Sequence, residues 1–372
     1  MKKEKAGTVV SLGVFLAIFC SGEKSRAQSV EVTALAPAVE REGITGAGRA
    51  VVSGDNKSRR VTLHFPIHPD DFGGSTGTAT AVSSDDGLTW TAGADDWPLP
   101  EMISLWQDRR RDGSLIAFGL HWAPDPSKRR ATTSIDTPDD AYLIGFSKDG
   151  DDWKTEPSVI DFPPELGVVA RPLPHIFEGE NGELFMPAYS WGKKGNRSIL
   201  LCSKDGGRHW ELRSTVTTAV AMIQAGATVT TPWLETIVSP TSDGSWLAVI
   251  RTGSNERSVL MTTRSTDQGH TWSPVEKVLA GREKKPVVGK LPGLILMPNG
   301  TLVLITAHMK LGCFLYLSAD GTGREWSKGH VVTTSTGGNT SMVGIDENRL
   351  MVFTPANGRI NCWRVTLGRP AQ

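Results

Sequence analysis

The stretch Ser83 to Trp90 reads Ser-Ser-Asp-Asp-Gly-Leu-Thr-Trp, and four further variants of the pattern Ser-x-Asp-x-Gly-x-Thr-Trp follow it. These variants begin at Ser147, Ser203, Ser265 and Ser318, so the starts lie between 53 and 64 residues apart. Repeats of this period are typical of propellers and solenoids. Because each unit is rich in Gly, Pro and turn residues, the repeat predicts one small four-stranded sheet per unit.

Each residue type in the repeat has a role in a tight turn. An Asp side chain accepts backbone N–H groups of its own turn, and Gly adopts the positive φ that other residues resist. The Trp then anchors the hairpin by burying a large ring. The pattern therefore predicts that the repeated aspartates are structural and not catalytic; they are Asp85, Asp149, Asp205, Asp267 and Asp320.

A second phrase recurs around these turns: an apolar strand, a turn that ends in Gly, and another apolar strand. It occupies 103–118, 174–189, 236–250 and 291–306, and a shorter version occupies 342–353. Asn-Gly and Asp-Gly between apolar runs are strong hairpin signals. With a first unit at 44–97, the chain contains six units, which predicts an all-β fold, a six-bladed β-propeller. Val30 and Val32 are expected to lie in a strand that joins the last blade and closes the ring.

The start of the chain has the features of an export signal. Lys2, Lys3 and Lys5 precede an apolar run over 9–19, and Ser25-Arg26-Ala27 offers small residues at a cleavage site. We expect a signal peptide at 1–27, one propeller domain at 28–372, and a secreted or periplasmic protein. Lipidation at Cys20 is the alternative, but the bulky Phe19 before it is untypical. No second apolar run reaches the length of a membrane span.

Composition excludes several classes of function. The 40 basic and 40 acidic residues cancel, and no long basic block occurs, which argues against a nucleic-acid partner. The cysteines after residue 27 are Cys202, Cys313 and Cys362, and they lack metal-ligand spacing. Phosphate-loop, dinucleotide, zinc-protease and serine-hydrolase motifs are absent from the sequence. We therefore expect neither a cofactor nor a metal.

The repeats, together with the phrase Asp-Gly-Ser-Trp-Leu-Ala-Val-Ile-Arg-Thr over 243–252, resemble the sialidase-like family of six-bladed propellers with Asp-box (BNR) repeats. The resemblance covers nearly all of the chain after residue 27. It implies a glycoside hydrolase that releases a terminal acidic sugar, such as sialic acid, from glycans. Members bind the sugar carboxylate with arginines, since a guanidinium fork matches a carboxylate. They use a Tyr nucleophile paired with a Glu, and an Asp as the acid and base.

Four of these roles transfer to individual positions. Arg49, in Gly-Arg-Ala-Val before the first repeat, matches the first arginine. Asp71, with Asp70 as the alternative, falls where the acid/base Asp belongs. Glu235 and Arg251 match the family's Glu and second arginine. The competing interpretations are an acidic turn for Asp71 and a structural ion pair for Glu235 and Arg251.

Two positions depart from the family pattern. Lys310 stands where the third arginine is expected, which keeps the charge but loses the fork. Asn339 aligns with the Tyr nucleophile, and Asn cannot form a glycosyl intermediate. Lys310 and Asn339 are therefore expected only to bind substrate.

The missing Tyr leaves other functions open. One is a different carbohydrate-active enzyme, a uronate lyase or an inverting hydrolase; another is a noncatalytic propeller that binds a glycan or a protein. His64 and His68, near Asp70 and Asp71, could supply a lyase base or metal ligands, or occupy ordinary loop and strand positions. Trp122 and Trp191 could stack on a sugar ring or pack within a blade.

Overall fold

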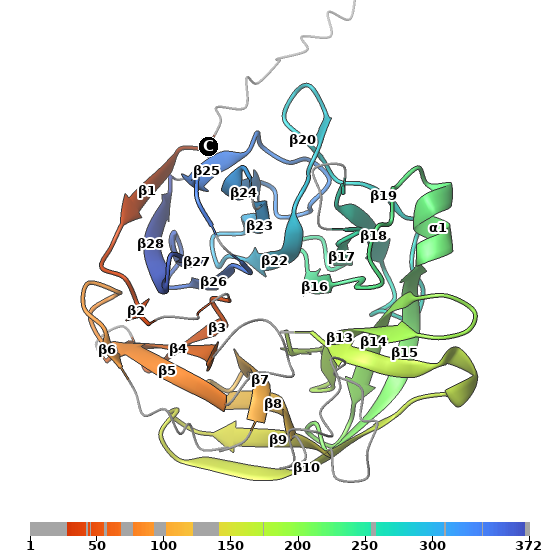
Figure 1. Cartoon of the computed structure of the whole chain (residues 1–372), viewed down its shortest axis with the longest axis horizontal. Helices are drawn as coiled ribbons and strands as arrows, with labels where there is room; N and C mark the ends of the chain where they lie inside the picture. The colour runs from red at the N-terminus through yellow and green to blue at the C-terminus, as the bar shows by residue number, and fades with distance from the viewer. Residues whose placement is uncertain are drawn as a thin grey trace, which may run out of the picture.

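The structure is a computed structural model, which describes residues 28–41, 44, 46–55, 58–67, 77–92, 102–121, 141–173, 175–253, 258–308, 310–336 and 338–368. The predicted signal peptide lies outside the described residues. The described chain is nearly all β, with one α-helix, α1 (Ala219–Gln224), and a 3-10 turn, η2 (Pro164–Leu166). The sheets stand in a ring around a common centre (Figure 1). The predicted all-β propeller fold is thus confirmed. No helix in the described part of the chain is long and apolar enough to span a membrane.

The strands run in chain order around the ring. They are β1 (Val30–Ala34), β2 (Val39–Glu40), β3 (Arg49–Ser53), β4 (Arg60–Ile67), β5 (Gly77–Ser83), β6 (Thr91–Ala92), β7 (Met102–Arg109), β8 (Leu115–His121), β9 (Ala141–Ser147), β10 (Trp153–Asp161), β11 (Val168–Pro172), β12 (Phe177–Glu178), β13 (Leu184–Trp191), β14 (Arg197–Ser203), β15 (His209–Thr218), β16 (Thr236–Pro240), β17 (Trp246–Ile250), β18 (Met261–Ser265), β19 (Glu276–Lys277), β20 (Leu279–Ala280), β21 (Lys285–Pro286), β22 (Lys290–Leu296), β23 (Leu302–His308), β24 (Gly312–Ser318), β25 (His330–Thr333), β26 (Ser341–Gly344), β27 (Arg349–Ala356) and β28 (Arg359–Leu367).

Three of the six sheets in the described chain are four-stranded antiparallel meanders. The orders β3-β4-β5-β6, β16-β17-β18-β19 and β22-β23-β24-β25 follow the chain, as the alternation of apolar strands and tight turns predicts. The strands β7 to β15 form one nine-stranded sheet, because β10 pairs in parallel with β15 over Val159–Asp161. Since this pairing fuses two of the predicted units, the division into six blades stays a prediction.

The N-terminal strand closes the ring. Strand β1 pairs antiparallel with β28 in the register Val30↔Leu367 to Ala34↔Trp363. The buried Gln28 holds the strand's start, because its side-chain amide donates to Thr301 Oγ1 (3.3 Å) and to Gly368 O (2.9 Å). The predicted closing strand at Val30 and Val32 is therefore confirmed.

The Asp boxes make the turn contacts that their composition predicts. Asp267 accepts hydrogen bonds from Ser265 Oγ (2.8 Å) and from the Thr271 N–H (2.9 Å), while Ser265 Oγ accepts the Gly269 N–H (2.8 Å). Gly269 has φ +79°, which explains why Gly stands at this position. The other repeated aspartates accept bonds within their own turns in the same way. Their predicted structural role is confirmed.

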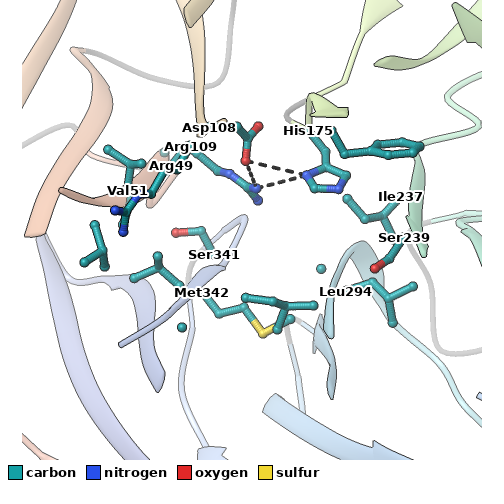
Figure 2. A pocket seen from close by; sticks show the side chains of 18 of the residues that line it. Arg49, Val51, Asp108, Arg109, His175, Ile237, Ser239, Leu294, Ser341 and Met342 are labelled. Atoms are coloured by element: carbon teal, nitrogen blue, oxygen red, sulfur yellow. Dashed lines mark hydrogen bonds and ion pairs between the residues drawn. The ribbon is translucent and has the colours of Figure 1, made fainter. Parts of the chain in front are cut away.

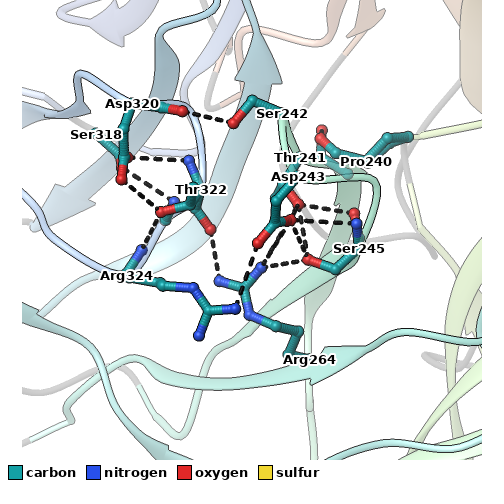
Figure 3. Close-up of polar contacts among 12 residues, drawn as sticks. Pro240, Thr241, Ser242, Asp243, Ser245, Arg264, Ser318, Asp320, Thr322 and Arg324 are labelled. Carbon is teal, nitrogen blue, oxygen red and sulfur yellow. Dashed lines mark hydrogen bonds and ion pairs between the residues drawn. The ribbon is translucent and has the colours of Figure 1, made fainter.

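A polar contact joins two neighbouring sheets at the hairpin of β16 and β17 (Figure 3). The Arg264 guanidinium donates to Ser245 Oγ in that hairpin and to Thr322 O in the last Asp box. Ser242 Oγ in turn donates to Asp320 O of the same box. The last Asp box therefore stabilises its own turn and also contacts the adjacent sheet.

Apolar side chains fill the space between sheets. Trp246 packs edge-on against Phe185 with ring centroids 4.7 Å apart, and Trp210 packs against Phe118 at 5.9 Å. Such pairs bury large aromatic area and fix the spacing between layers. The first strand of each unit lies on the inner side of these apolar layers. It therefore faces the centre of the ring, where a cavity remains.

Candidate functional site

A cavity of about 690 Å³ occupies the centre of the ring. Its wall is formed mainly by the strands nearest the centre in Figure 1: β3, β7, β11, β16, β22 and β26. Much of the wall is apolar, and the polar side chains gather on the side of β3, β7 and β11. A large apolar cavity with a few convergent polar groups is the usual form of a small-molecule site.

Arg49 is central to this polar side (Figure 2). Its Nη2 contacts Asp108 Oδ1 and lies 3.1 Å from His175 Nδ1. The second carboxylate oxygen of Asp108 accepts the Ile176 N–H at 2.7 Å. Burial opposes ionisation of Asp108, but the Arg49 charge, the nearby His175 and the Ile176 hydrogen bond together outweigh it, so the pKa of Asp108 is lowered. The Nε of Arg49 is buried and has no hydrogen-bond partner in the part of the chain that the structure describes.

The contact with Arg49 fixes the tautomer of His175. A guanidinium nitrogen only donates, so Nδ1 of His175 must accept and the ring proton lies on Nε2. The distance of 3.6 Å from His175 Nδ1 to Asp108 Oδ1 is too long for a hydrogen bond. His175 also lines the cavity, so its Nε2–H is a candidate donor to a ligand.

A second polar cluster lies behind the wall at β11. Arg171, which lines the cavity, shares a side-chain hydrogen bond with Tyr189, and Tyr189 also interacts electrostatically with Glu235 and Arg251. Burial raises the pKa of Tyr189 to about 12, with Glu235 adding to the effect and Arg171 and Arg251 opposing it. The phenol is therefore protonated near neutral pH.

Glu235 and Arg251 form a buried ion pair beside Tyr189. Arg251 Nη1 contacts Glu235 Oε2, and Arg251 Nε donates to Gly253 O at 2.8 Å. Both residues are 5% exposed, and neither is among the described residues that line the cavity. The structure thus shows the ion pair that was the competing interpretation of Glu235 and Arg251.

The remaining predicted residues are dispersed. Asn339 is half-buried and lines the cavity near Arg49, where its carbonyl accepts the Ala47 N–H at 3.0 Å. Lys310 is exposed after β23, and its N–H donates to His308 Nδ1 at 3.2 Å. Asp71 and Asp70 lie outside the described residues, as do His68 and Trp122. Arg49 and Asn339 therefore share one cavity, and Lys310 is not among its described lining residues.

Sequence reasoning did not single out Asp108, His175 or Arg171, and it gave no role to Tyr189. The feature that could have indicated them is a charged residue in an otherwise apolar inner strand. Asp108 precedes the Asp-Gly turn in this way, and Arg171 precedes a proline. Nothing in the local pattern indicated that residues 59 positions apart, such as Arg49 and Asp108, would meet.

The free hydrogen-bonding groups of the cavity suit an oxygen-rich, anionic ligand. Arg49 Nε and Ser341 Oγ are buried and have no hydrogen-bond partner among the residues described, and a buried unpaired group costs roughly 1–3 kcal/mol. Ser341 lies on β26 and bounds the cavity with Arg49 (Figure 2). Among the described side chains, no three His, Cys, Asp or Glu gather to hold a metal ion.

Comparisons with known proteins agree with this fold. The family model of the BNR repeat-like domain matches residues 109–280, and no curated protein matches. A protein of unknown function from Dyadobacter fermentans DSM 18053 is 18% identical (TM-score 0.65, 91% of this chain, 99% of that one). The Hadza microbial sialidase Hz136 is 14% identical (TM-score 0.62, 88% of this chain, 66% of that one).

A third solved structure is a mutant of the α-L-arabinofuranosidase arb93a of Fusarium graminearum in complex with an iminosugar inhibitor, and it is also 14% identical. Its TM-score is 0.56, and the match covers 89% of this chain and 95% of that one. At these identities the likeness concerns the fold. The chain thus has the sialidase-like β-propeller fold, and residues 109–280 of it are similar to the BNR repeat-like domain.

Proposed function

We propose that this sialidase-like propeller is an exported exo-glycosidase that releases a terminal acidic sugar, sialic acid or a related one, from glycans. The observation that carries the proposal is Arg49, a largely buried side chain that faces a cavity of about 690 Å³ and whose Nε has no hydrogen-bond partner among the described residues. A sugar carboxylate would satisfy that donor. Two structural neighbours, a sialidase and an arabinofuranosidase, support glycoside hydrolysis as the class of reaction.

The proposed carboxylate ligands are Arg49 and Arg171, which line the same cavity from β3 and β11. Asn339 would bind sugar hydroxyl groups from the segment that precedes β26, and Lys310 would contact substrate from the rim. Arg251 acts through Glu235, since it is hydrogen-bonded to that carboxylate. Charge-assisted hydrogen bonds from arginine are the strong contacts in such sites.

For the chemical step we propose Asp71 as the acid and Glu235 as the group that activates water. Tyr189 lies beside Glu235, but a phenol with a pKa of about 12 is a poor nucleophile at neutral pH. Direct attack by water predicts inversion at the anomeric carbon. In that case the two carboxyl groups must stand about 6.5–9.5 Å apart when substrate is bound.

The test is hydrolysis of fluorogenic sialosides and uronides by the purified chain, with Arg171→Gln as the variant. We expect release of the sugar by the wild type and a loss of at least about 100-fold in kcat/KM for Arg171→Gln. The control is Arg110→Ala, because Arg110 is engaged with Glu178 (2.9 Å) outside the cavity wall. Absence of turnover with every acidic glycoside would overturn the proposal, and unsaturated products would identify a uronate lyase.

A neutral furanoside substrate is the second candidate. It is favoured by the near-complete match to the arabinofuranosidase, 95% of that chain, and by the pairing of Arg49 with Asp108, which offsets its charge. An arabinofuranoside in the same substrate panel separates the two. Glycan binding with no bond cleaved would instead identify a noncatalytic receptor.

A further inference from the structure

Trp233 is more exposed to solvent than any other described Trp, Tyr or Phe side chain. It is 43% exposed, and the other exposed large apolar side chains are aliphatic: Leu88, Val159, Val168, Val220, Ile223, Leu279, Leu311 and Val331. An exposed tryptophan leaves a large apolar area in water, which is unfavourable unless a ligand or partner covers it.

The ring has no part in the repeat that stabilises the sheets. Three of the box tryptophans donate their indole N–H to their own turns: Trp90 to Gly87 O (3.2 Å), Trp153 to Gly150 O (3.0 Å) and Trp210 to Gly207 O (2.9 Å). Trp233 lies instead in the segment that leads into β16, two residues before Glu235. Its exposure therefore does not follow from the folding role of tryptophan in this chain.

The contacts of Trp233 hold its ring in place. The Cζ of Arg251 lies 5.9 Å from the centre of the ring, a cation–π contact on one face. The preceding residue, Pro232, accepts the indole N–H of Trp191 at 3.3 Å, which ties the segment to β13. One face is backed by a buried arginine, and because 43% of the residue is exposed to solvent, we infer that the opposite face is the open one.

We propose that the open face of Trp233 binds the neutral hexopyranose to which the terminal acidic sugar is attached. This inference rests on the proposed function and deepens it, because Arg251 connects Trp233 directly to Glu235. A pyranose presents ring C–H groups on one face, which pack on an indole without needing a charge. The carboxylate of the acidic sugar, in contrast, would be bound in the cavity by Arg49 and Arg171.

Binding without turnover provides the first test. Methyl β-galactoside and methyl β-glucoside are the probes, observed by saturation-transfer NMR with the full chain. We expect saturation transfer to at least one of them, its loss in Trp233→Ala, and partial retention in Trp233→Phe, which keeps an aromatic face. Val220→Ala is the matched control, since Val220 is 55% exposed on α1. Equal saturation transfer in Trp233→Ala and wild type would overturn the inference, as would its absence with both probes.

Kinetics provide the second test and separate the two proposals. For an acidic sugar linked to galactose we expect Trp233→Ala to raise KM by about tenfold with kcat little changed, and Trp233→Phe to raise it less. For the methyl glycoside of the same acidic sugar we expect no change. An equal change for both substrates would contradict the role of Trp233. If the wild type binds the neutral probes through Trp233 but cleaves nothing, the proposed hydrolysis fails while the sugar site stands.

Discussion

Arg49 of β3 forms an ion pair with Asp108 of β7, and the pair joins neighbouring inner strands at the wall of the central cavity. Both side chains are largely buried, at 17% and 11% exposure. Each of these charges is stabilised by the other, so loss of either partner should destabilise the ring. One of the two, Arg49, is also proposed to bind substrate.

Asp108→Leu should destabilise the protein by about 3–5 kcal/mol, since it leaves the Arg49 charge buried without its partner. It also removes the acceptor of the Ile176 N–H. Urea unfolding measures the loss. The double variant Arg49→Met/Asp108→Leu should recover part of it, and a double variant no more stable than Asp108→Leu would contradict this account.

Tyr189→Phe should leave hydrolysis within about threefold of wild type, because the hydroxyl is proposed to position Arg171 and not to attack. The lost hydrogen bond to Arg171 should cost about 1 kcal/mol of stability. Steady-state kinetics and thermal melts give both values. A loss of catalysis by several orders of magnitude with retained sugar binding would instead make Tyr189 the nucleophile.

The Asp boxes should make the fold sensitive to acid below about pH 4. Hydrogen bonds from Thr271 lower the pKa of Asp267 to about 2 from its ordinary value of 3.8, and the pKa values of the other box aspartates are lowered too. A depressed folded pKa contributes stability that is present above the unfolded value and is lost as pH falls through the folded value. Urea unfolding from pH 5 to pH 2 should show this decline, and Asp267→Asn should weaken it. An unchanged pH profile in Asp267→Asn would refute the assignment.

His64 should produce a separate pH dependence at higher pH. Burial, with a smaller effect of Arg60, lowers its pKa from 6.5 to about 3, so the folded state remains neutral where the unfolded state binds a proton. Stability should therefore decline as pH falls from about 6.5 towards 3. His64→Leu should flatten this part of the profile, measured by unfolding at pH 7 and pH 5. The same slope in the variant would show that other groups cause it.

Arg264→Ala should lower the free energy of unfolding by about 2–3 kcal/mol, because it removes charged hydrogen bonds that join two sheets, to Ser245 Oγ and Thr322 O. The comparison is Arg359→Ala, whose pair with Glu40 is 47% and 68% exposed and should be worth less than about 1 kcal/mol. Denaturant midpoints measure both variants. Equal effects would mean that the contact in Figure 3 does not join the sheets energetically.

The sequence predicts the parts of this molecule that depend on local chemistry. Asp267 and Gly269 predict their turn because the residues that form it are neighbours in the chain, and the closing strand at Val30 follows from counting such units. The site is different. Arg49 was singled out by resemblance, but its partners Asp108 and His175 lie on separate strands, and only the packing of inner strands brings them together. The sequence did not indicate a role for Tyr189 for the same reason. The groups that interact with it, Arg171 and Glu235, lie in other parts of the chain and come close to it only in the folded protein.

The pairing of β1 with β28 has a consequence for biosynthesis. The two strands lie far apart in the sequence, so β1 lacks the strand it pairs with until β28 has been made. Until then β1 and the sheet of β26 and β27 present unpaired edges, which favour aggregation. Premature termination before residue 359 would therefore yield a chain that cannot complete its circle, and we expect quality-control proteases to remove it.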